Sequence, residues 1–223
     1  MRVTVFNGSP RARAGNTEVI VQAFLRGAAR ARAETESVYL IEKQVGHCRG
    51  CFHCWFKTPG RCVQRDDMDA LLGLYCRSQI VGFASPVYTW NVTAALNNFV
   101  DRLIPLKSPV VTQSGERFDL RDAVARETAF VAIANAGFPG GDNFETIRRV
   151  FAPCNPALEI YRNCGLLMTG GGPEVREAVV SYLQCVEQAG FELVSDGAVT
   201  GATRQGLERE LVSTEAYLKY LGM

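Results

Sequence analysis

The 223 residues of this chain, 47% of them hydrophobic and 21% charged, have the length and composition typical of one globular α/β domain. The formal net charge of +1 offers no basic field for nucleic acid or a membrane surface, and no apolar run is long enough to span a bilayer. The N-terminus shows no signal-peptide pattern, so we expect a cytoplasmic protein whose eight cysteines serve as thiols or metal ligands rather than disulfides.

The stretch from Val3 to Thr17 predicts a buried strand, a loop of small, hydroxyl and basic residues, and then a helix that continues to about residue 33. The amides of a helix N-terminus favour an anion. Ser9, Thr17 and the amide of Asn16 could therefore surround one phosphate, to which Arg11 would add positive charge. The alternative is an ordinary turn in which Asn16 or Thr17 only caps the helix.

Further along the chain, apolar runs typical of strands alternate with segments of helical periodicity. Strands are predicted within 37–41, 79–84, 128–134 and 159–168, and helices from 66, over 92–103, from 143, over 173–190 and from 206. We expect Asp66 and Asp67 to cap their helix, and a long irregular excursion with short strands over 107–127. The alternation predicts one domain over 1–223, a doubly wound five-stranded parallel sheet with helices on both faces and a C-terminal helical extension over 206–223.

Three unusual loops follow the first, third and fourth predicted strands, and parallel strands bring such loops to one edge of the sheet. The second loop offers Pro86, Tyr88 and Trp90 as a flat apolar surface, and the third offers Ala136 and Gly137, where backbone can approach a planar ligand. Together the loops predict a mononucleotide site for one phosphate and a large flat ring, for which FMN is the natural candidate. The alternative is that the aromatics belong to the core or an interface and the glycines only make turns.

The loop over 46–65 contains the pattern C-x2-C-x2-C-x7-C, formed by Cys48, Cys51, Cys54 and Cys62. Three closely spaced thiolates can wrap one face of a compact cluster, and the pattern begins like the bacterial ferredoxin run, although Val63 and not proline follows the fourth cysteine. Tetrahedral zinc fits this crowding less well, while a thiol–disulfide switch or thiols without metal stay open. The remaining cysteines are expected to be buried small hydrophobes: Cys76, Cys154, Cys164 and Cys185.

Three motifs occur in a fixed order along the first two-thirds of the chain: Gly8-Ser9-Pro10-Arg11 with Gly15-Asn16-Thr17, then C-x-G-C-x-x-C ahead of Asp66-Asp67-Met68, then Ser85-Pro86-Val87-Tyr88. This order resembles the flavodoxin-like NAD(P)H-dependent FMN reductases, and most of all the iron–sulfur flavoproteins. The resemblance implies an FMN site with the phosphate end at Ser9, Arg11, Gly15, Asn16 and Thr17, the ribityl chain and ring along Pro86, Val87, Tyr88 and Trp90, and the ring edge at Asn135, Ala136 and Gly137.

The resemblance also implies a [4Fe-4S] cluster on the four loop cysteines, which would relay electrons between a carrier such as ferredoxin and FMN in a homodimer or homotetramer. Without a cluster, NAD(P)H would reduce FMN directly, and a small-molecule acceptor such as a quinone would be reduced in turn. Because the flavin carries the chemistry, no catalytic side chain is expected. A different class of function is a non-enzymatic redox or metal sensor, in which oxidation reorders the cysteine loop.

Overall fold

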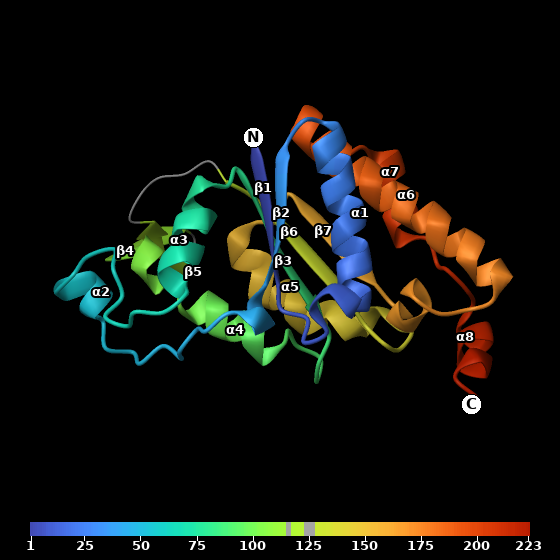
Figure 1. Cartoon of the computed structure of the whole chain (residues 1–223), viewed down its shortest axis with the longest axis horizontal. Coiled ribbons are helices and arrows are strands. Elements are labelled where there is room, and N and C mark those ends of the chain that lie inside the picture. Colours follow the sequence, from blue (N-terminus) through green and yellow to red (C-terminus); the bar gives the residue numbers. More distant parts are fainter. Residues whose placement is uncertain (115–116, 123–127) are drawn as a thin grey trace.

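The structure is a computed structural model, and it describes residues 1–114, 117–122 and 128–223. Its central sheet has five parallel strands in the order β2-β1-β3-β6-β7 (Figure 1). These are β1 (Arg2–Asn7), β2 (Glu34–Tyr39), β3 (Ile80–Pro86), β6 (Ala129–Asn135) and β7 (Leu158–Arg162). The strand order reverses between β1 and β3, which confirms the doubly wound, flavodoxin-like sheet.

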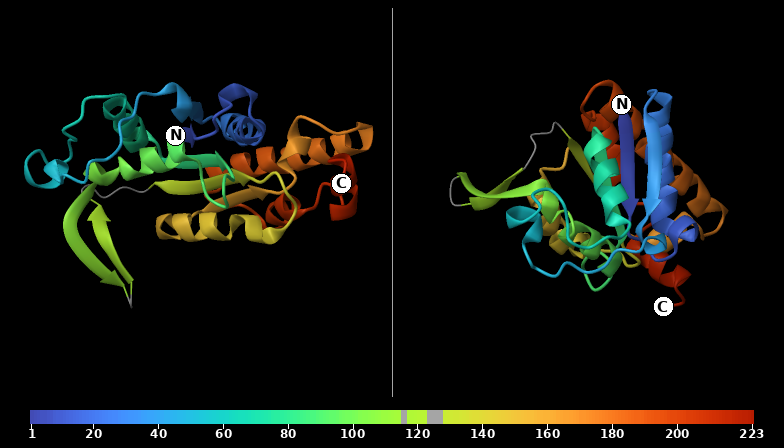
Figure 2. Two further views of the ribbon diagram at one scale, coloured as in Figure 1. Left: turned by 90° about the horizontal axis from the view of Figure 1, so that it is seen from below. Right: turned by 60° about the vertical axis from the view of Figure 1, so that its left-hand side comes forward.

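Helices cover both faces of this sheet (Figure 2). One face packs on α1 (Asn16–Arg30), α6 (Pro173–Ser195), α7 (Gly201–Glu208) and α8 (Thr214–Tyr220), and the other on α3 (Met68–Arg77), α4 (Ala94–Asp101) and α5 (Glu145–Phe151). Alternate strand residues supply the two cores, as Val5 does on the α1 side and Phe6 on the α4 side. None of the helices in the described part of the chain has the length and apolar character to cross a membrane.

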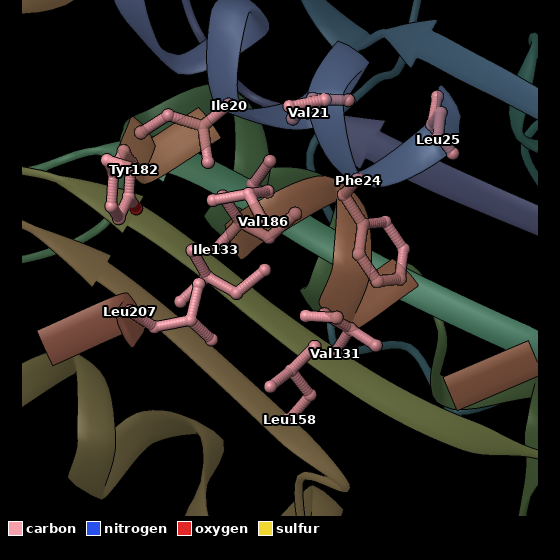
Figure 3. Packing of buried hydrophobic residues seen from close by; sticks show 14 of the residues in the cluster. Ile20, Val21, Phe24, Leu25, Val131, Ile133, Leu158, Tyr182, Val186 and Leu207 are labelled. Atoms are coloured by element: carbon pink, nitrogen blue, oxygen red, sulfur yellow. The ribbon is translucent and has the colours of Figure 1, made fainter. Parts of the chain in front are cut away.

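Helices α1 and α6 lie unusually close together over the core shown in Figure 3. A Cβ atom on Gly27 would lie 1.7 Å from the carbonyl oxygen of Glu187, and one on Gly190 would lie 2.2 Å from that of Phe24. The prediction that the long helix ends near Gly190 is wrong, because α6 continues to Ser195. Gly190 allows the helices to approach each other and does not end the helix.

We predict opposite effects for alanine at two mid-helix glycines. Gly27→Ala should lower the free energy of unfolding by about 3 kcal/mol, because the new methyl group overlaps backbone of α6. Gly73→Ala on α3 should raise it by about 0.5–1 kcal/mol, because its nearest neighbour is the movable end of Arg77 at 3.0 Å. Urea denaturation measures both, and a shift of the same sign in the two variants would contradict this packing.

The segment predicted as an irregular excursion forms an antiparallel hairpin of β4 (Lys107–Ser114) and β5 (Arg117–Asp122), which confirms the expected short strands. The hairpin projects from the body of the molecule (Figure 2). An ion pair of 2.8 Å between Lys107 Nζ and Asp122 Oδ1 joins the two strands at the base. Residues 123–127, also in the predicted excursion, lie outside the described residues.

Helix α3 begins at Met68, directly after the two predicted capping residues. Asp67 is the N-cap residue but makes no side-chain cap, so the predicted capping is wrong, although Asp66 Oδ1 accepts the backbone N–H of Met68 at 3.1 Å. Asp67 Oδ2 instead accepts the backbone N–H of Gln44 at 2.8 Å, so it ties α3 to the chain that precedes the cysteine loop. Two helices, α7 and α8, occupy the C-terminal region for which one was predicted.

Candidate functional site

The loops that follow β1, β3 and β6 meet at one cavity of about 410 Å³, as the topology predicts. Eleven of the twelve residues predicted to bind the cofactor line this cavity, and Gly15 is the one that does not. The full lining is Ser9, Arg11, Asn16, Thr17, Pro86, Val87, Tyr88, Thr89, Trp90, Asn135, Ala136, Gly137, Phe138, Asn143 and Leu166.

The N-terminus of α1 faces the first loop and has Gly15 as its N-cap residue, with no side-chain cap. The alternative in which Asn16 or Thr17 caps the helix is therefore wrong. A Cβ on Gly15 would lie 2.6 Å from Ser9 Oγ, so the absence of a side chain lets the loop close onto the helix. The first-turn amides and the positive end of the helix dipole remain for an anion.

Two arginines of this loop differ in their partners. Arg13 forms an ion pair of 2.7 Å with Glu42, and its guanidinium lies 4.4 Å from the ring centroid of Tyr39. Arg11 is exposed, lines the cavity and has no ion-pair partner among the described residues. Arg11 is therefore the cation of this loop that an incoming anion can meet.

A buried carboxylate, Glu18, lies in the first turn of α1 behind the loop. It accepts hydrogen bonds from Asn7 Nδ2 at 2.7 Å, Tyr39 Oη at 2.7 Å and Gln22 Nε2 at 2.6 Å. Burial and the hydrogen bond to Glu18 raise the pKa of Tyr39, so its hydroxyl stays a donor. Asn7 Oδ1 in turn accepts the backbone N–H of Ser9 at 2.8 Å, and Glu18 thus fixes the shape of the loop through Asn7.

Hydrogen bonds between the three loops hold the walls of the cavity together. Thr17 Oγ1 donates to Asn135 Oδ1 at 2.5 Å, and the backbone N–H of Val87 donates to the Asn135 carbonyl at 2.8 Å. Thr93 Oγ1 donates to the Gly8 carbonyl at 2.7 Å. Because the Thr17 proton is directed to Asn135, this hydroxyl can offer a ligand only its acceptor electrons, and donation to an anion falls to the backbone amides, Arg11 and the Ser9 hydroxyl.

Aromatic side chains form the open rim of the cavity. Thr89 and Trp90 have φ values of 49° and 56°, and they form a tight turn closed by paired backbone hydrogen bonds between Tyr88 and Asn91. Tyr88, Trp90 and Phe138 are 52%, 62% and 66% exposed. The alternative that Tyr88 and Trp90 are core aromatics is therefore wrong, and the rim offers flat apolar surface to a ring.

Four lining residues were absent from the sequence prediction. Thr89 and Phe138 lie directly beside predicted residues, so the loops themselves point to them. Asn143 donates through Nδ2 to the carbonyls of three consecutive residues, 138–140, and so folds the third loop. Leu166 comes from a 3-10 turn after β7, where the sequence predicted strand and gave no signal of a site.

The C-terminal helix α8 contacts the third loop directly. Tyr217 is fully buried, and its hydroxyl donates to the carbonyl oxygen of Gly137, which lines the cavity. Burial, followed by the nearby charges of Cys164 and Tyr220, raises the pKa of Tyr217 to about 12. The C-terminal extension therefore packs on its own chain and supports the loop that faces the cavity.

We predict that Tyr217→Phe lowers the free energy of unfolding by about 1 kcal/mol at neutral pH, because the Gly137 carbonyl loses its donor. The folded-state pKa of about 12 lies above the ordinary value of 10.0, so the contribution is complete below pH 10 and is lost as the pH rises toward 12. Denaturation of wild type and Tyr217→Phe across this pH range measures the difference in their free energies of unfolding. A constant stability difference between the two proteins would contradict the role of Tyr217.

The four loop cysteines line a second, small cavity of about 30 Å³. Cys54 is buried, Cys62 is half-buried, and Cys48 and Cys51 are exposed. Burial and the neighbouring Cys62, with smaller contributions from Cys48 and Cys51, raise the pKa of the Cys54 thiol. The sequence pattern thus brings the four predicted ligands together.

Within the described residues, no group of three or more His, Cys, Asp or Glu side chains is placed to hold a metal ion. The thiols nonetheless have the chemistry of a [4Fe-4S] ligand set, in which each thiolate binds a different iron and the sulfurs need not converge on one point. The cavity has room for on the order of one water molecule. A cluster would therefore require Cys48 and Cys51 to move outward, and their exposure permits it.

The other cysteines only partly match the prediction of burial. Cys164 is buried and Cys185 is half-buried, whereas Cys76 and Cys154 are exposed. Cys76 lies near the end of α3, where Leu71, Leu72 and Leu74 face the core and Cys76 lies outside this apolar stripe.

Comparison with known proteins agrees with this geometry. The family model for NADPH-dependent FMN reductase matches residues 1–141. The chain is 42% identical over 105 residues to an iron-sulfur flavoprotein of Archaeoglobus fulgidus, a match that covers 47% of this chain and 46% of that protein. It is 34% identical over 137 residues to an iron-sulfur flavoprotein of Methanocaldococcus jannaschii, covering 61% of this chain and 65% of the relative.

Among solved structures, the fold is similar to that of an FMN-dependent NADH-azoreductase of Bacillus anthracis in complex with FMN, with a TM-score of 0.61. This match covers 86% of the present chain and 99% of the azoreductase at 12% sequence identity, so it shows a shared fold alone. The matched segments span less than two-thirds of the length of both iron-sulfur flavoproteins.

Proposed function

The chain belongs to the NADPH-dependent FMN reductase family, and from this premise we propose that it is an FMN-binding oxidoreductase of the iron–sulfur flavoprotein type. The observation that supports this most strongly is the single cavity that the loops after β1, β3 and β6 share. It combines a helix N-terminus and the exposed Arg11 at one end with an aromatic rim. A flavin mononucleotide has matching parts, since a phosphate is joined to a large flat ring.

In this proposal FMN, when bound, supplies the hydride and electron chemistry, and the protein positions it. The phosphate lies against Ser9, Arg11 and the α1 amides of Asn16 and Thr17. The ring lies along the loop after β3, with its edge toward the loop after β6. No side chain acts as a catalytic acid or base, and the small-molecule acceptor approaches the ring past the exposed aromatics.

Arg11 provides the most direct test of the phosphate end. Arg11→Gln should raise the dissociation constant for FMN about tenfold, because one charge-assisted contact at an exposed position is lost. Arg13→Gln removes a cation from the same loop, but that cation already pairs with Glu42, so FMN affinity should stay within about twofold. Flavin fluorescence titration measures both constants. Equal weakening by the two variants would indicate a general charge effect and not a phosphate contact.

We further propose that the cysteine loop binds a [4Fe-4S] cluster, which exchanges single electrons with FMN and with a carrier such as ferredoxin. The support is the set of four thiols on one cavity and the name that both curated relatives carry. The assembly in this proposal is a homodimer or homotetramer, in which the flavin lies near a subunit boundary. Anaerobic assays with reduced ferredoxin and with NAD(P)H distinguish the two donors.

The competing function is a cluster-free NAD(P)H-dependent FMN or quinone reductase. The small size of the cysteine cavity favours it, because the loop as folded has no space for a cluster. In that case NAD(P)H would sustain turnover as the only electron donor, and the protein purified without oxygen would contain flavin but no iron.

The cluster assignment predicts that Cys54→Ala lowers iron from about four atoms per chain to near zero in protein purified without oxygen. Flavin content should not change, because the two cavities share no lining residue. Cys76→Ala, which replaces an exposed thiol outside the loop, is the matched control and should retain its iron. Iron and acid-labile sulfide analysis decides the outcome, and equal iron in both variants would refute the assignment.

A further inference from the structure

Arg102, at the C-terminal end of α4, is a buried cation that joins the two ends of the cysteine loop. Its side chain is 1% exposed. Nη1 donates to the Gly46 carbonyl at 2.5 Å and to Asp66 Oδ2 at 2.7 Å, and Nη2 donates to Asp66 Oδ1 at 3.0 Å. Gly46 opens the loop and Asp66 follows its last residue, so one guanidinium holds both ends.

Helix α4 makes a second attachment one turn earlier. Asn98 Nδ2 donates to the Val45 carbonyl at 2.7 Å, and Asn98 Oδ1 lies 3.1 Å from His47 Nδ1. Residues four apart share one helix face, so Asn98 and Arg102 together fix the start of the loop on α4. The two exposed cysteines lie between these fixed ends, in the part of the loop that must move outward to admit a cluster.

Arg102 also lines the cavity of the four cysteines. Although burial alone lowers the pKa of Arg102, its contacts with Asp66 and Cys62 raise it above the ordinary value, and the guanidinium stays charged. Its Nε is buried and has no hydrogen-bond partner among the described residues. An unpaired buried donor of this kind is costly, and a sulfur ligand in the cavity would supply an acceptor.

The ion pair with Asp66 is charged at neutral pH. Burial raises the pKa of Asp66, but hydrogen bonds from Arg102 and from the N–H groups of Gly46 and Met68 outweigh it and lower the pKa below its ordinary value. The loop itself carries only positive charge, with Arg49, Lys57, Arg61 and Arg65 and no Asp or Glu over 46–65. An anionic occupant suits this environment, as expected of thiolates that bind iron and sulfide.

We propose that Arg102 is a positioning residue of the cysteine site, which anchors the loop ends on α4 and sets the reduction potential by placing a fixed positive charge beside the sulfur ligands. The inference rests on the proposed cluster-binding function. An added electron makes the site more negative, and an adjacent cation stabilises that charge. Arg102 therefore favours the reduced state, and the carboxylate of Asp66 partly offsets this effect.

Trypsin digestion of the metal-free protein tests the anchor. Arg102→Lys keeps the buried charge but loses the forked contact with Gly46 and Asp66, so cleavage after Arg49 and Lys57 should be on the order of tenfold faster than in wild type. Arg65→Gln is the matched control, because it removes a surface ion pair of 3.0 Å with Asp69 at the same end of the loop. Equal cleavage rates in wild type and Arg102→Lys would overturn the anchor.

The reduction potential of the reconstituted protein tests the charge. Arg102→Gln should lower the potential, Asp66→Asn should raise it, and Arg102→Lys should keep it near that of wild type. Loss of packing alone does not give shifts of opposite sign. If Arg102→Gln does not fold, as judged from circular dichroism and FMN content, Asp66→Asn decides the outcome. An unchanged or lowered potential in Asp66→Asn overturns the charge role.

Different results would refute the proposed cluster and the proposed role of Arg102. If wild-type protein takes up no iron under anaerobic reconstitution, the cluster and the charge role of Arg102 are both wrong, while faster cleavage of Arg102→Lys would still establish the anchor. If wild-type protein binds iron but the potentials of the variants match it, the charge role of Arg102 is wrong, and the cleavage rates alone decide the anchor.

Discussion

The hydrogen bond from Thr17 to Asn135 holds the candidate site together across the sheet. Thr17 lies in the first turn of α1, which follows β1, and Asn135 ends β6, which is separated from β1 by β3. The bond therefore spans the switch point. The loop after β3, which lies between the other two, is joined to them because the backbone N–H of Val87 donates to the Asn135 carbonyl. Since these contacts join backbone and side chains of all three loops, they fix the walls of the cavity.

Helix α4 links this cavity to the cysteine loop. At its N-terminal end, Thr93 bonds the carbonyl of Gly8 in the first loop. At its other end, Arg102 bonds Gly46 and Asp66 at the two ends of the cysteine loop. The helix between them has eight residues, or about 12 Å, and a short helix packed on the sheet is a rigid spacer. The positions of the two cavities are thus set by one element, and neither depends on a long flexible connection.

The sequence predicted the sheet and the place of the site well, because both depend on local patterns. Alternating strands and helices determine a parallel sheet, and a parallel sheet brings the loops after its strands to one edge. The roles of Gly190 and Tyr217 depend instead on partners far away in the chain, Phe24 and Gly137. No local pattern contains such pairings. For the same reason, the sequence predicted Thr17 beside a phosphate but not the hydrogen bond that its hydroxyl donates to Asn135, 118 positions away.

The comparison of FMN with riboflavin tests the central claim most directly, because the two ligands differ only in the phosphate that the α1 amides and Arg11 are proposed to hold. Two or more charge-assisted hydrogen bonds contribute about 3 kcal/mol, so FMN should bind at least about 100-fold more tightly than riboflavin. Fluorescence titration of the flavin-free protein with each ligand gives both constants. Equal affinities would contradict the claim that the loop after β1 is a phosphate site.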